Sequence, residues 1–345
     1  MLKKIICCGL LLLIKEIKGI EMDCRQRIVS TIVRAHRQLE GGGFEVRRPF
    51  PSNNVLGEQF DPFLLLDHLG PIEAKPGEAV GAPWHPHRGF QTISYLLEGE
   101  LVHKDSAGNT GTLRPGDFQL MTAGAGVIHD ESPSDYVKQH GGRSEGFQIW
   151  VNLRKVDKMI EPYYQDFAAD SIPIYQGERF IAKIAAGTGF DLTGPVETKT
   201  PIQFIDVHAE PDAIIEHSLP MAFSLGIYVY RGSIIFPNQP SNRNSKANEG
   251  DFAVLENVAD DSSTGTSLAR IIVPEHAGPT KFLILAGIPL RESIARAGPF
   301  VMNTQAELRQ AFLDYQSGNF AKIPATFKSK TRHTDKFDPT KHKLV

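Results

Sequence analysis

The sequence contains little cysteine. Its three cysteines, Cys7, Cys8 and Cys24, all precede the first globular-looking segment of the 345-residue chain. The chain from Met22 onward has one cysteine and cannot close an internal disulfide. This excludes a disulfide-stapled scaffold and a Cys-x-x-Cys metal site, and it favours a reducing compartment. We therefore expect a cytoplasmic location, or a nuclear one in a eukaryotic source.

The sequence also lacks an excess of charge of either sign. Lysine and arginine number 37 against 40 aspartates and glutamates, so the formal net charge is -3. A near-neutral chain gives no electrostatic case for nucleic acid as a ligand. The apolar run from Ile5 to Ile14 is too short to span a membrane as a helix. We expect neither direct nucleic-acid contact nor membrane contact.

Two interpretations of residues 1–27 stay open. Lys3 and Lys4 precede the apolar run, which imitates a secretory signal peptide, but no small-residue cleavage site follows. Met22 offers an alternative start of translation. Residues 1–27 are then either an unstructured leader or a targeting segment, and we expect the fold not to depend on them.

After Ile28, short apolar runs alternate with glycine, proline and aspartate. Examples are Phe90 to Leu97, Phe118 to Met121 and Phe147 to Leu153. The 31 glycines and 23 prolines of the chain supply many turns. Few runs are long enough at the helical period to form helices. The pattern predicts an all-β chain folded as a sandwich or a barrel.

Three motifs of the chain recur at nearly one offset. The offsets are 133, 134 and 135 residues. We interpret them as two copies of one β unit, spanning about 45–165 and about 195–290. The matched segments are Tyr95–Gly99 with Tyr228–Gly232, Gly116–Phe118 with Gly250–Phe252, and Phe147–Val151 with Phe282–Ala286.

The last part of the chain has a helical pattern. Thr304 and Glu307 form a capping-box pattern, and apolar residues follow at helical spacing before Ser317 and Gly318. This predicts one amphipathic helix within residues 301–321 that packs on the body. The lysine-rich residues 322–345 predict a solvated, disordered tail, with nucleic-acid or membrane contact as the alternative interpretation.

Two short histidine motifs carry the candidate chemistry. His85-Pro-His87 precedes the predicted strand from Phe90, and His129-Asp-Glu131 follows a glycine-rich stretch. Residues i and i+2 of an extended chain point to the same face, so each pair presents its side chains together. If both pairs face one barrel interior, three imidazoles and one carboxylate converge, which suits a divalent transition metal. Four protein ligands on an octahedral ion leave two positions for substrate and for dioxygen or water.

Either pair alone is weak evidence for a metal site. With 12 histidines, on the order of 0.4 His-x-His pairs are expected by chance, and a lone exposed histidine is more often a surface residue. The context strengthens the hypothesis, because both pairs lie in the first repeat, on either side of its Gly-Asp turn. In the second repeat the equivalent positions fall near Leu219–Met221 and Ser263–Gly265, which offer no such ligands. We therefore predict one metal site, in the first unit.

Several longer motifs occur in order along roughly 28–320 of the chain. They are Asp61–Asp67 with Gly70-Pro71, His85–Phe90, His103–Asn109, Arg114–Asp117, Met121–Gly124 with His129–Glu131, Gly146–Leu153 and Gly298–Thr304. At these residues the chain resembles the pirin family of bicupins. The leader and the lysine-rich tail lie outside the resemblance.

The resemblance implies a fold and a domain organisation. It implies an all-β protein of two cupin (jelly-roll β-barrel) domains that stand face to face, with a short C-terminal helix. We expect the metal-bearing N-terminal cupin over residues 28–165 and a C-terminal cupin without a metal site over residues 166–300. We expect the protein to be a monomer.

The resemblance also implies a metal and an activity. Members carry one metal ion, usually iron, and the family's ligand pattern falls on His85, His87, His129 and Glu131. We predict one Fe per chain, although the ligand types suit other divalent transition metals too. Members are described as quercetin 2,3-dioxygenases, so we predict a dioxygenase that acts on flavonol-like phenols. The alternative is a non-enzymatic, iron-dependent redox sensor that binds a transcription or metabolic partner protein.

Individual residues carry further expectations. Glu131 is the candidate catalytic residue, because it could accept the hydroxyl proton of the substrate as well as bind the metal. Gln91 stands where many relatives have glutamate, and we place it beside the metal ligands. Trp84 replaces a more polar residue and would narrow the pocket mouth or stack over it. His103 lies either on the pocket wall or on the surface.

Overall fold

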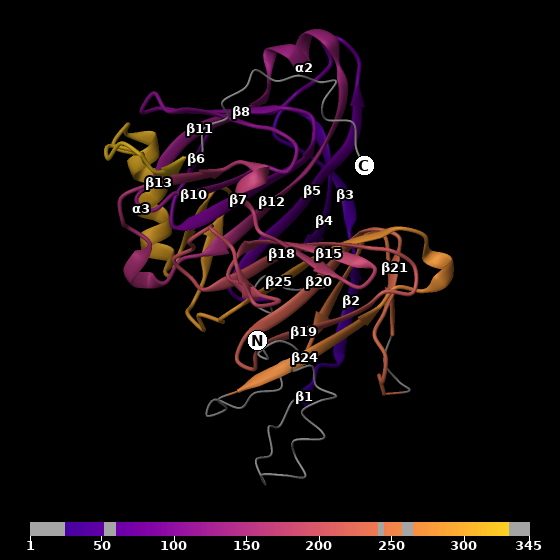
Figure 1. Ribbon diagram of the computed structural model, residues 1–345. Helices are drawn as coiled ribbons and strands as arrows, with labels where there is room; N and C mark the ends of the chain where they lie inside the picture. Colours follow the sequence, from indigo (N-terminus) through magenta and orange to yellow (C-terminus); the bar gives the residue numbers. More distant parts are fainter. Residues whose placement is uncertain (1–24, 52–59, 241–244, 257–264, 331–345) are drawn as a thin grey trace, which may run out of the picture.

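The computed structural model describes residues 25–51, 60–240, 245–256 and 265–330. Strands dominate these residues and form two β-barrel units, one above the other in Figure 1. Because the short apolar runs are separated by turn residues, they form strands rather than helices. The predicted all-β fold of two barrels with a short C-terminal helix is confirmed.

The first unit consists of two sheets. Its larger sheet has the strand order β28-β13-β10-β7-β12-β5-β4-β3, and its smaller sheet has the order β6-β11-β8-β9. The candidate metal ligands lie on β6 and β11, so the smaller sheet positions them. The bounds are β3 (His36–Glu40), β4 (Phe44–Phe50), β5 (Phe63–Ala74), β6 (Ala82–His87), β7 (Phe90–Glu98), β8 (Leu101–Asp105), β9 (Thr110–Leu113), β10 (Phe118–Thr122), β11 (Val127–Pro133), α2 (Asp135–His140), β12 (Gly142–Asn152), β13 (Tyr163–Phe167) and β28 (Thr326–Lys330).

The second unit repeats this arrangement. Its larger sheet has the order β14-β15-β18-β25-β20-β23-β2, and its smaller sheet has the order β1-β24-β21-β22 with β19 paired to β24. The bounds are β1 (Arg25–Gln26), β2 (Val29–Arg34), β14 (Ile174–Gly177), β15 (Phe180–Ala186), β16 (Thr188–Gly189), β17 (Leu192–Thr193), β18 (Ile202–Ala209), β19 (Ile214–Pro220), β20 (Ser224–Arg231), β21 (Ser233–Ile235), β22 (Lys246–Asn248), β23 (Asp251–Leu255), β24 (Thr266–Ile272) and β25 (Thr280–Gly287). A final hairpin of β26 (Ala295–Ala297) and β27 (Phe300–Met302) precedes the C-terminal helix.

The internal repeat of the sequence corresponds to equivalent strands. In the first unit β7 pairs antiparallel with both β10 and β12. In the second unit β20 pairs antiparallel with both β23 and β25. The three recurring motifs fall on these strands or on the turn residues directly next to them, so the predicted duplication of one β unit is confirmed.

An apolar core joins the two barrels. It includes buried rings from both units, such as Phe50 and Tyr95 of the first and Phe204 and Phe252 of the second. The ring centroids of Phe50 and Phe252 are 4.9 Å apart, and those of Tyr95 and Phe204 are 5.8 Å apart. Burying a side chain of this size contributes about 1.5–3 kcal/mol. The shared core therefore holds the barrels face to face, as the resemblance implied.

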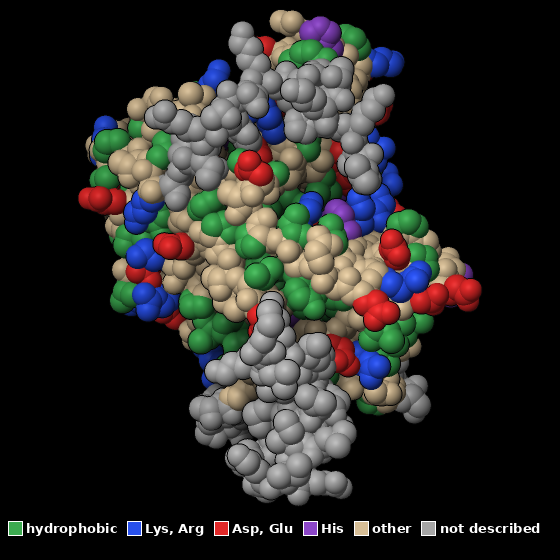
Figure 2. All heavy atoms as spheres, viewed as in Figure 1, with side chains coloured by type: hydrophobic (Ala, Val, Ile, Leu, Met, Phe, Trp, Pro, Cys, Tyr) green, Lys and Arg blue, Asp and Glu red, His purple; other side chains and the backbone are tan. Residues whose placement is uncertain are grey.

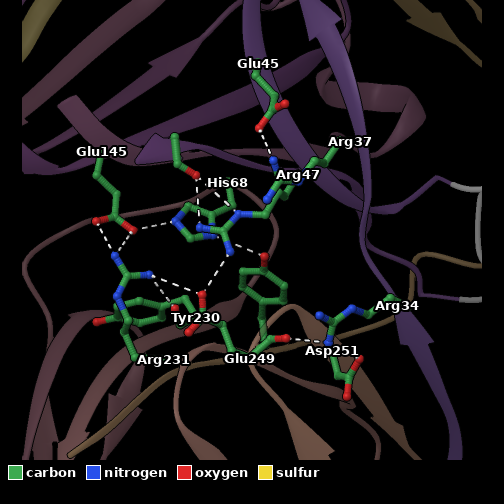
Figure 3. A network of polar contacts seen from close by, with 12 residues as sticks. Arg34, Arg37, Glu45, Arg47, His68, Glu145, Tyr230, Arg231, Glu249 and Asp251 are labelled. Atoms are coloured by element: carbon green, nitrogen blue, oxygen red, sulfur yellow. Dashed lines mark hydrogen bonds and ion pairs between the residues drawn. The ribbon is translucent and has the colours of Figure 1, made fainter. Parts of the chain in front are cut away.

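Polar contacts cross the same interface, and Figure 3 shows them. The Nη2 atom of Arg231 donates to both carboxylate oxygens of Glu145, at 2.8 and 2.7 Å. The Nε2 atom of His68 donates to Glu145 at 2.8 Å. Burial lowers the pKa of His68 to about 4, so its ring is neutral near pH 7. These contacts tie β5 and β12 of the first unit to β20 of the second.

The two ends of the described chain pack on the opposite units. β2 pairs with β23, and the buried Arg27 guanidinium donates to Ser267 Oγ and to the Met221 carbonyl oxygen. β28 pairs with β13 of the first unit. Strand pairing thus crosses the expected domain boundaries at both ends, and the last three residues of the expected leader belong to the second barrel. The expectations for residues 1–24 and 331–345 concern residues outside the described ones.

The predicted C-terminal helix is present as α3 (Gln305–Gln316). Thr304 Oγ1 accepts a hydrogen bond from the Glu307 amide at 3.2 Å, and the Glu307 carboxylate accepts one from the Thr304 amide at 2.9 Å. The buried residues Leu308 and Ala311 pack with Phe300. Figure 1 shows α3 beside the first barrel. The capping box and the packing of the helix on the body are therefore as predicted.

The described surface carries charges of both signs. Figure 2 shows acidic and basic side chains side by side over much of one face, in agreement with the near-neutral net charge. Among the described residues, no helix is long and apolar enough to cross a membrane. The expected cytoplasmic location stays a prediction.

Candidate metal centre

The two histidine motifs lie on neighbouring antiparallel strands, β6 and β11. His85 and His129 are directly paired across these strands. Buried and half-buried residues alternate along β11, so His129 and Glu131 both face inward, as their spacing predicts. Gly89 follows β6 with a φ of 89°. A Cβ atom there would lie 2.0 Å from the Val301 carbonyl oxygen, so this close approach requires glycine.

Three of the four predicted ligands come together. One side-chain nitrogen from each of His85, His87 and His129 lies within 4.8 Å of the other two. Their ring centroids are 4.7 Å apart for His85 and His87, 4.3 Å for His85 and His129, and 4.9 Å for His87 and His129. A cluster of three imidazoles at this spacing can hold one transition-metal ion.

Hydrogen bonds of the Nδ1 atoms orient these rings. His85 Nδ1 is 2.8 Å from the Pro83 carbonyl oxygen, and His87 Nδ1 is 3.4 Å from the Pro299 carbonyl oxygen. Because a carbonyl only accepts, both Nδ1 atoms carry the proton and both Nε2 atoms have a free lone pair. The Nε2 atoms of His87 and His129 are buried without a hydrogen-bond partner among the described residues. Two buried imidazole nitrogens without a partner in one cluster fit a bound metal ion.

The protonation states favour the same role. Burial, followed by repulsion from His85, holds the pKa of His87 well below its ordinary value. Burial, followed by repulsion from the other histidines of the cluster, does the same for His129. Both rings are therefore neutral at pH 7, which is the state that binds a metal.

Glu131, the fourth predicted ligand, is buried on the same face of β11. Its carboxylate oxygens accept hydrogen bonds from Ser94 Oγ at 3.1 Å and from Gln148 Nε2 at 2.8 Å. The group of nitrogens within 4.8 Å does not include this carboxylate. Its roles as ligand and as proton acceptor stay predictions.

The sequence leaves open whether His103 lies on the pocket wall or on the surface. The side chain is fully buried, so the surface interpretation is wrong. Its Nε2 atom lies 3.0 Å from His129 Nδ1, and β8 places it opposite Glu131. His103 therefore orients a candidate ligand, as groups behind metal-binding histidines commonly do. The alternation of inward and outward side chains along β8 is the sequence signal that bears on whether His103 is buried.

The structure agrees with the expected position of Trp84 but not with the expected position of Gln91 beside the metal ligands. Gln91 is buried, but it donates to Thr122 Oγ1 at 2.7 Å and accepts from the Lys199 amide at 3.0 Å. The Lys199 contact bridges the two barrels, and neither contact supports a histidine of the cluster. Trp84 is exposed and lines the cavity beside His85, which agrees with the expected place at the pocket mouth.

A cavity of about 830 Å³ opens beside the histidine cluster. His85, His87 and Glu131 line it, together with aromatic and aliphatic side chains such as Trp150 and Leu65. Sites for organic ligands of moderate size have volumes in this range and are mostly apolar with a few polar groups. The cavity therefore gives a substrate direct access to the candidate metal centre.

The end of the chain supports the ligand strand. The Arg88 guanidinium donates to Asp314 at 2.7 Å and to the Ala125 carbonyl at 2.7 Å. The buried Lys158 ammonium donates to the carbonyl oxygens of Gly89 and Val301, at 2.8 and 3.0 Å. Of these partners, Asp314, like the Pro299 carbonyl that faces His87, lies more than 200 positions away in sequence from the end of β6 that it fixes. No local signal predicts them.

The fold and the histidine cluster define a class of protein. Two cupin barrels stand face to face, and one of them carries three inward-facing histidines beside a cavity, as in bicupins. Comparison with protein families gives the finer assignment. The family models described as Pirin and Pirin C-terminal cupin domain match residues 43–151 and 204–321. The chain belongs to the pirin family.

Individual relatives agree with this assignment. Pirin of Homo sapiens is 36% identical over 306 residues, which are 88% of this chain and 97% of that protein. A pirin-like protein of Solanum lycopersicum is 34% identical and covers 85% of this chain and 93% of its own length. A solved structure of quercetin 2,3-dioxygenase from Acinetobacter baumannii is 34% identical, with a TM-score of 0.77 over 86% of this chain and 99% of that one.

Proposed function

We propose that this chain is a metal-dependent dioxygenase that acts on flavonol-like phenols. The observation that carries the proposal is the cluster of His85, His87 and His129, two of whose members, His85 and His87, line the large cavity. The similarity to a solved quercetin 2,3-dioxygenase supports the reaction type. The three histidines would hold the ion through their Nε2 atoms, with Glu131 as the fourth ligand.

The resident metal in this proposal is iron, one ion per chain. Three imidazoles and a carboxylate bind Mn, Ni, Cu or Zn as well, so the choice of iron comes from the family rather than from the ligand types. When bound, the ion would supply Lewis acidity and redox chemistry for opening the phenolic ring.

The protein's own groups bind and orient the substrate. The apolar lining of the cavity, including Leu65 and Trp150, would take the planar ring system and exclude water from it. Glu131 would accept the proton of the substrate hydroxyl. Its hydrogen bonds to Ser94 and Gln148 hold the carboxylate in place for that transfer.

A second candidate function is redox-dependent regulation through a partner protein. Large apolar side chains are exposed on the cavity lining, namely Leu39 at 70%, Val80 at 48% and Trp84 at 54%. Exposed apolar groups beside a functional site are typical of contact surfaces. A partner that covers this rim would sense a change of charge at the metal.

Oxygen uptake tests the first proposal against the second. The protein is loaded with Fe(II), its metal content is measured, and dioxygen consumption is followed with quercetin. We expect uptake that is lost in His87→Ala and kept in the control His140→Ala, which changes an exposed histidine on α2. A fully loaded protein that consumes no dioxygen with quercetin or related flavonols would refute the dioxygenase proposal and favour the regulator.

A further inference from the structure

Arg296 places a positive charge on the wall of the cavity. It lies on β26, far in sequence from the histidine cluster, yet it lines the same cavity as His85, His87 and Glu131. Its guanidinium carbon is 4.7 Å from the ring centroid of Trp150. The Trp150 ring is in turn 5.2 Å from the His87 ring. Trp150 therefore contacts both the cation and the candidate metal ligand.

Among the described residues, most N–H groups of the Arg296 guanidinium make no hydrogen bond. Its Nη1 atom donates to the Leu64 carbonyl oxygen at 2.9 Å. Within the described ranges it makes no ion pair with a carboxylate, although Asp67 and Glu40 lie close enough to act on its charge. The other arginine of the cavity lining differs: Arg48 binds both carboxylate oxygens of Asp67 at 2.6 Å and lies 2.8 Å from Glu40.

The remaining charges of the lining are negative. The lining contains no lysine, and apart from the two arginines its charged residues are acidic: Glu40, Glu45, Asp67, Glu73, Glu78, Glu100, Glu131 and Glu145. Five of these carboxylates are in ion pairs with arginines, as Glu145 is with Arg231 and Glu100 with Arg114, so Arg296 is the cation of the described lining without an ion pair. Burial, and then repulsion from Arg48, lowers the pKa of Arg296 to about 10, so the guanidinium keeps its charge at neutral pH.

We propose that Arg296 is a specificity-determining residue that selects planar aromatic substrates bearing an anionic oxygen group. The substrate ring would lie against Trp150, and its carboxylate or phenolate would take the free guanidinium donors as a charge-assisted pair. Because the anion has one favourable position, the pair fixes which edge of the ring faces the histidine cluster. This inference rests on the proposed function and names the substrate class of that site.

Direct binding tests the inference without turnover. The probes are 3-hydroxyflavone-4'-carboxylate and its neutral methyl ester, titrated calorimetrically into the metal-loaded protein without dioxygen. We expect the protein to bind the carboxylate more tightly than the ester. Arg296→Gln should weaken carboxylate binding by about tenfold or more, since a hydrogen-bonded ion pair is lost, and should leave ester binding within about twofold. Arg296→Lys keeps the positive charge, so it should weaken carboxylate binding less than Arg296→Gln does.

The control is Arg309→Gln, which removes the same charge from an exposed position on α3 outside the cavity lining. It should leave both affinities unchanged. Tighter binding of the ester than of the carboxylate by the unmodified protein would overturn the inference, even if Arg296→Gln failed to fold. Equal weakening of both probes in Arg296→Gln would also overturn it. Absence of oxygen uptake with the charge preference intact would instead count against the dioxygenase proposal alone.

Discussion

Lys158 offers a pH-dependent test of how the C-terminal segment supports the ligand strand. The ammonium is almost completely buried and donates to Gly89, Val301 and the Asn152 side-chain oxygen at 2.7 Å. Burial lowers its pKa from 10.5 to about 8. The unfolded chain then binds more protons than the folded one between these two pKa values, so this group makes the protein more stable as the pH rises through that window.

The expected size follows from the two pKa values. Below pH 8 the buried ammonium costs the folded state about 3 kcal/mol relative to an unperturbed lysine, and about 2 kcal/mol of this is recovered between pH 7 and pH 9.5. Lys158→Met removes the titrating group and its three hydrogen bonds. The free energy of unfolding of the unmodified protein, minus that of the variant, should therefore rise by about 2 kcal/mol over this range.

The assay is urea unfolding at pH 7, 8, 9 and 9.5, followed by tryptophan fluorescence. Using the difference between two proteins cancels the titration of other groups. Lys155→Met is the matched control, because it makes the same change at an exposed lysine three residues earlier, and its difference should not depend on pH. A difference for Lys158→Met that stays flat or falls with pH would refute the reasoning.

Three further predictions concern the histidine cluster, the barrel interface and the helix cap. His129→Ala should reduce the bound metal at least about tenfold by elemental analysis, and the same content as in His140→Ala would contradict its role as ligand. Tyr95→Phe removes the donor of a 2.7 Å hydrogen bond to the buried Asp206, so it should lower the free energy of unfolding in urea by about 1.5–3 kcal/mol. An unchanged midpoint of urea unfolding would contradict this prediction. Thr304→Ala should cost about 0.5–2 kcal/mol in the same assay, whereas Thr304→Ser should restore the cap, and equal losses in both would argue that the cap is unimportant.

Local signals predicted much of the fold because their causes act over a few residues. Thr304 and Glu307 cap α3 as their spacing indicates. The i, i+2 spacing of His129 and Glu131 places both on one face of β11, since the period of a strand is two. The recurring motifs also identified equivalent strands, because a duplicated unit keeps its turn residues and apolar runs.

The rest of the site depends on packing between distant segments. Pro299 accepts from His87 and Arg296 reaches the cavity only because β26 and α3 return to the first barrel. The contact of His103 with His129 depends on the register of β8 against β11, which a single sequence does not fix. The cavity itself is a property of several strands at once.

The exchange of chain ends between the barrels makes each half incomplete without the other. A single backbone cut near residue 170 would leave β2 on the N-terminal fragment and its partner strand β23 on the C-terminal fragment. The same cut would separate β13 from β28 and the histidine strand from the helix that braces it. Each piece alone would expose an unpaired strand edge. A nicked protein is therefore expected to stay assembled through these two strand pairings and to unfold in a single cooperative transition.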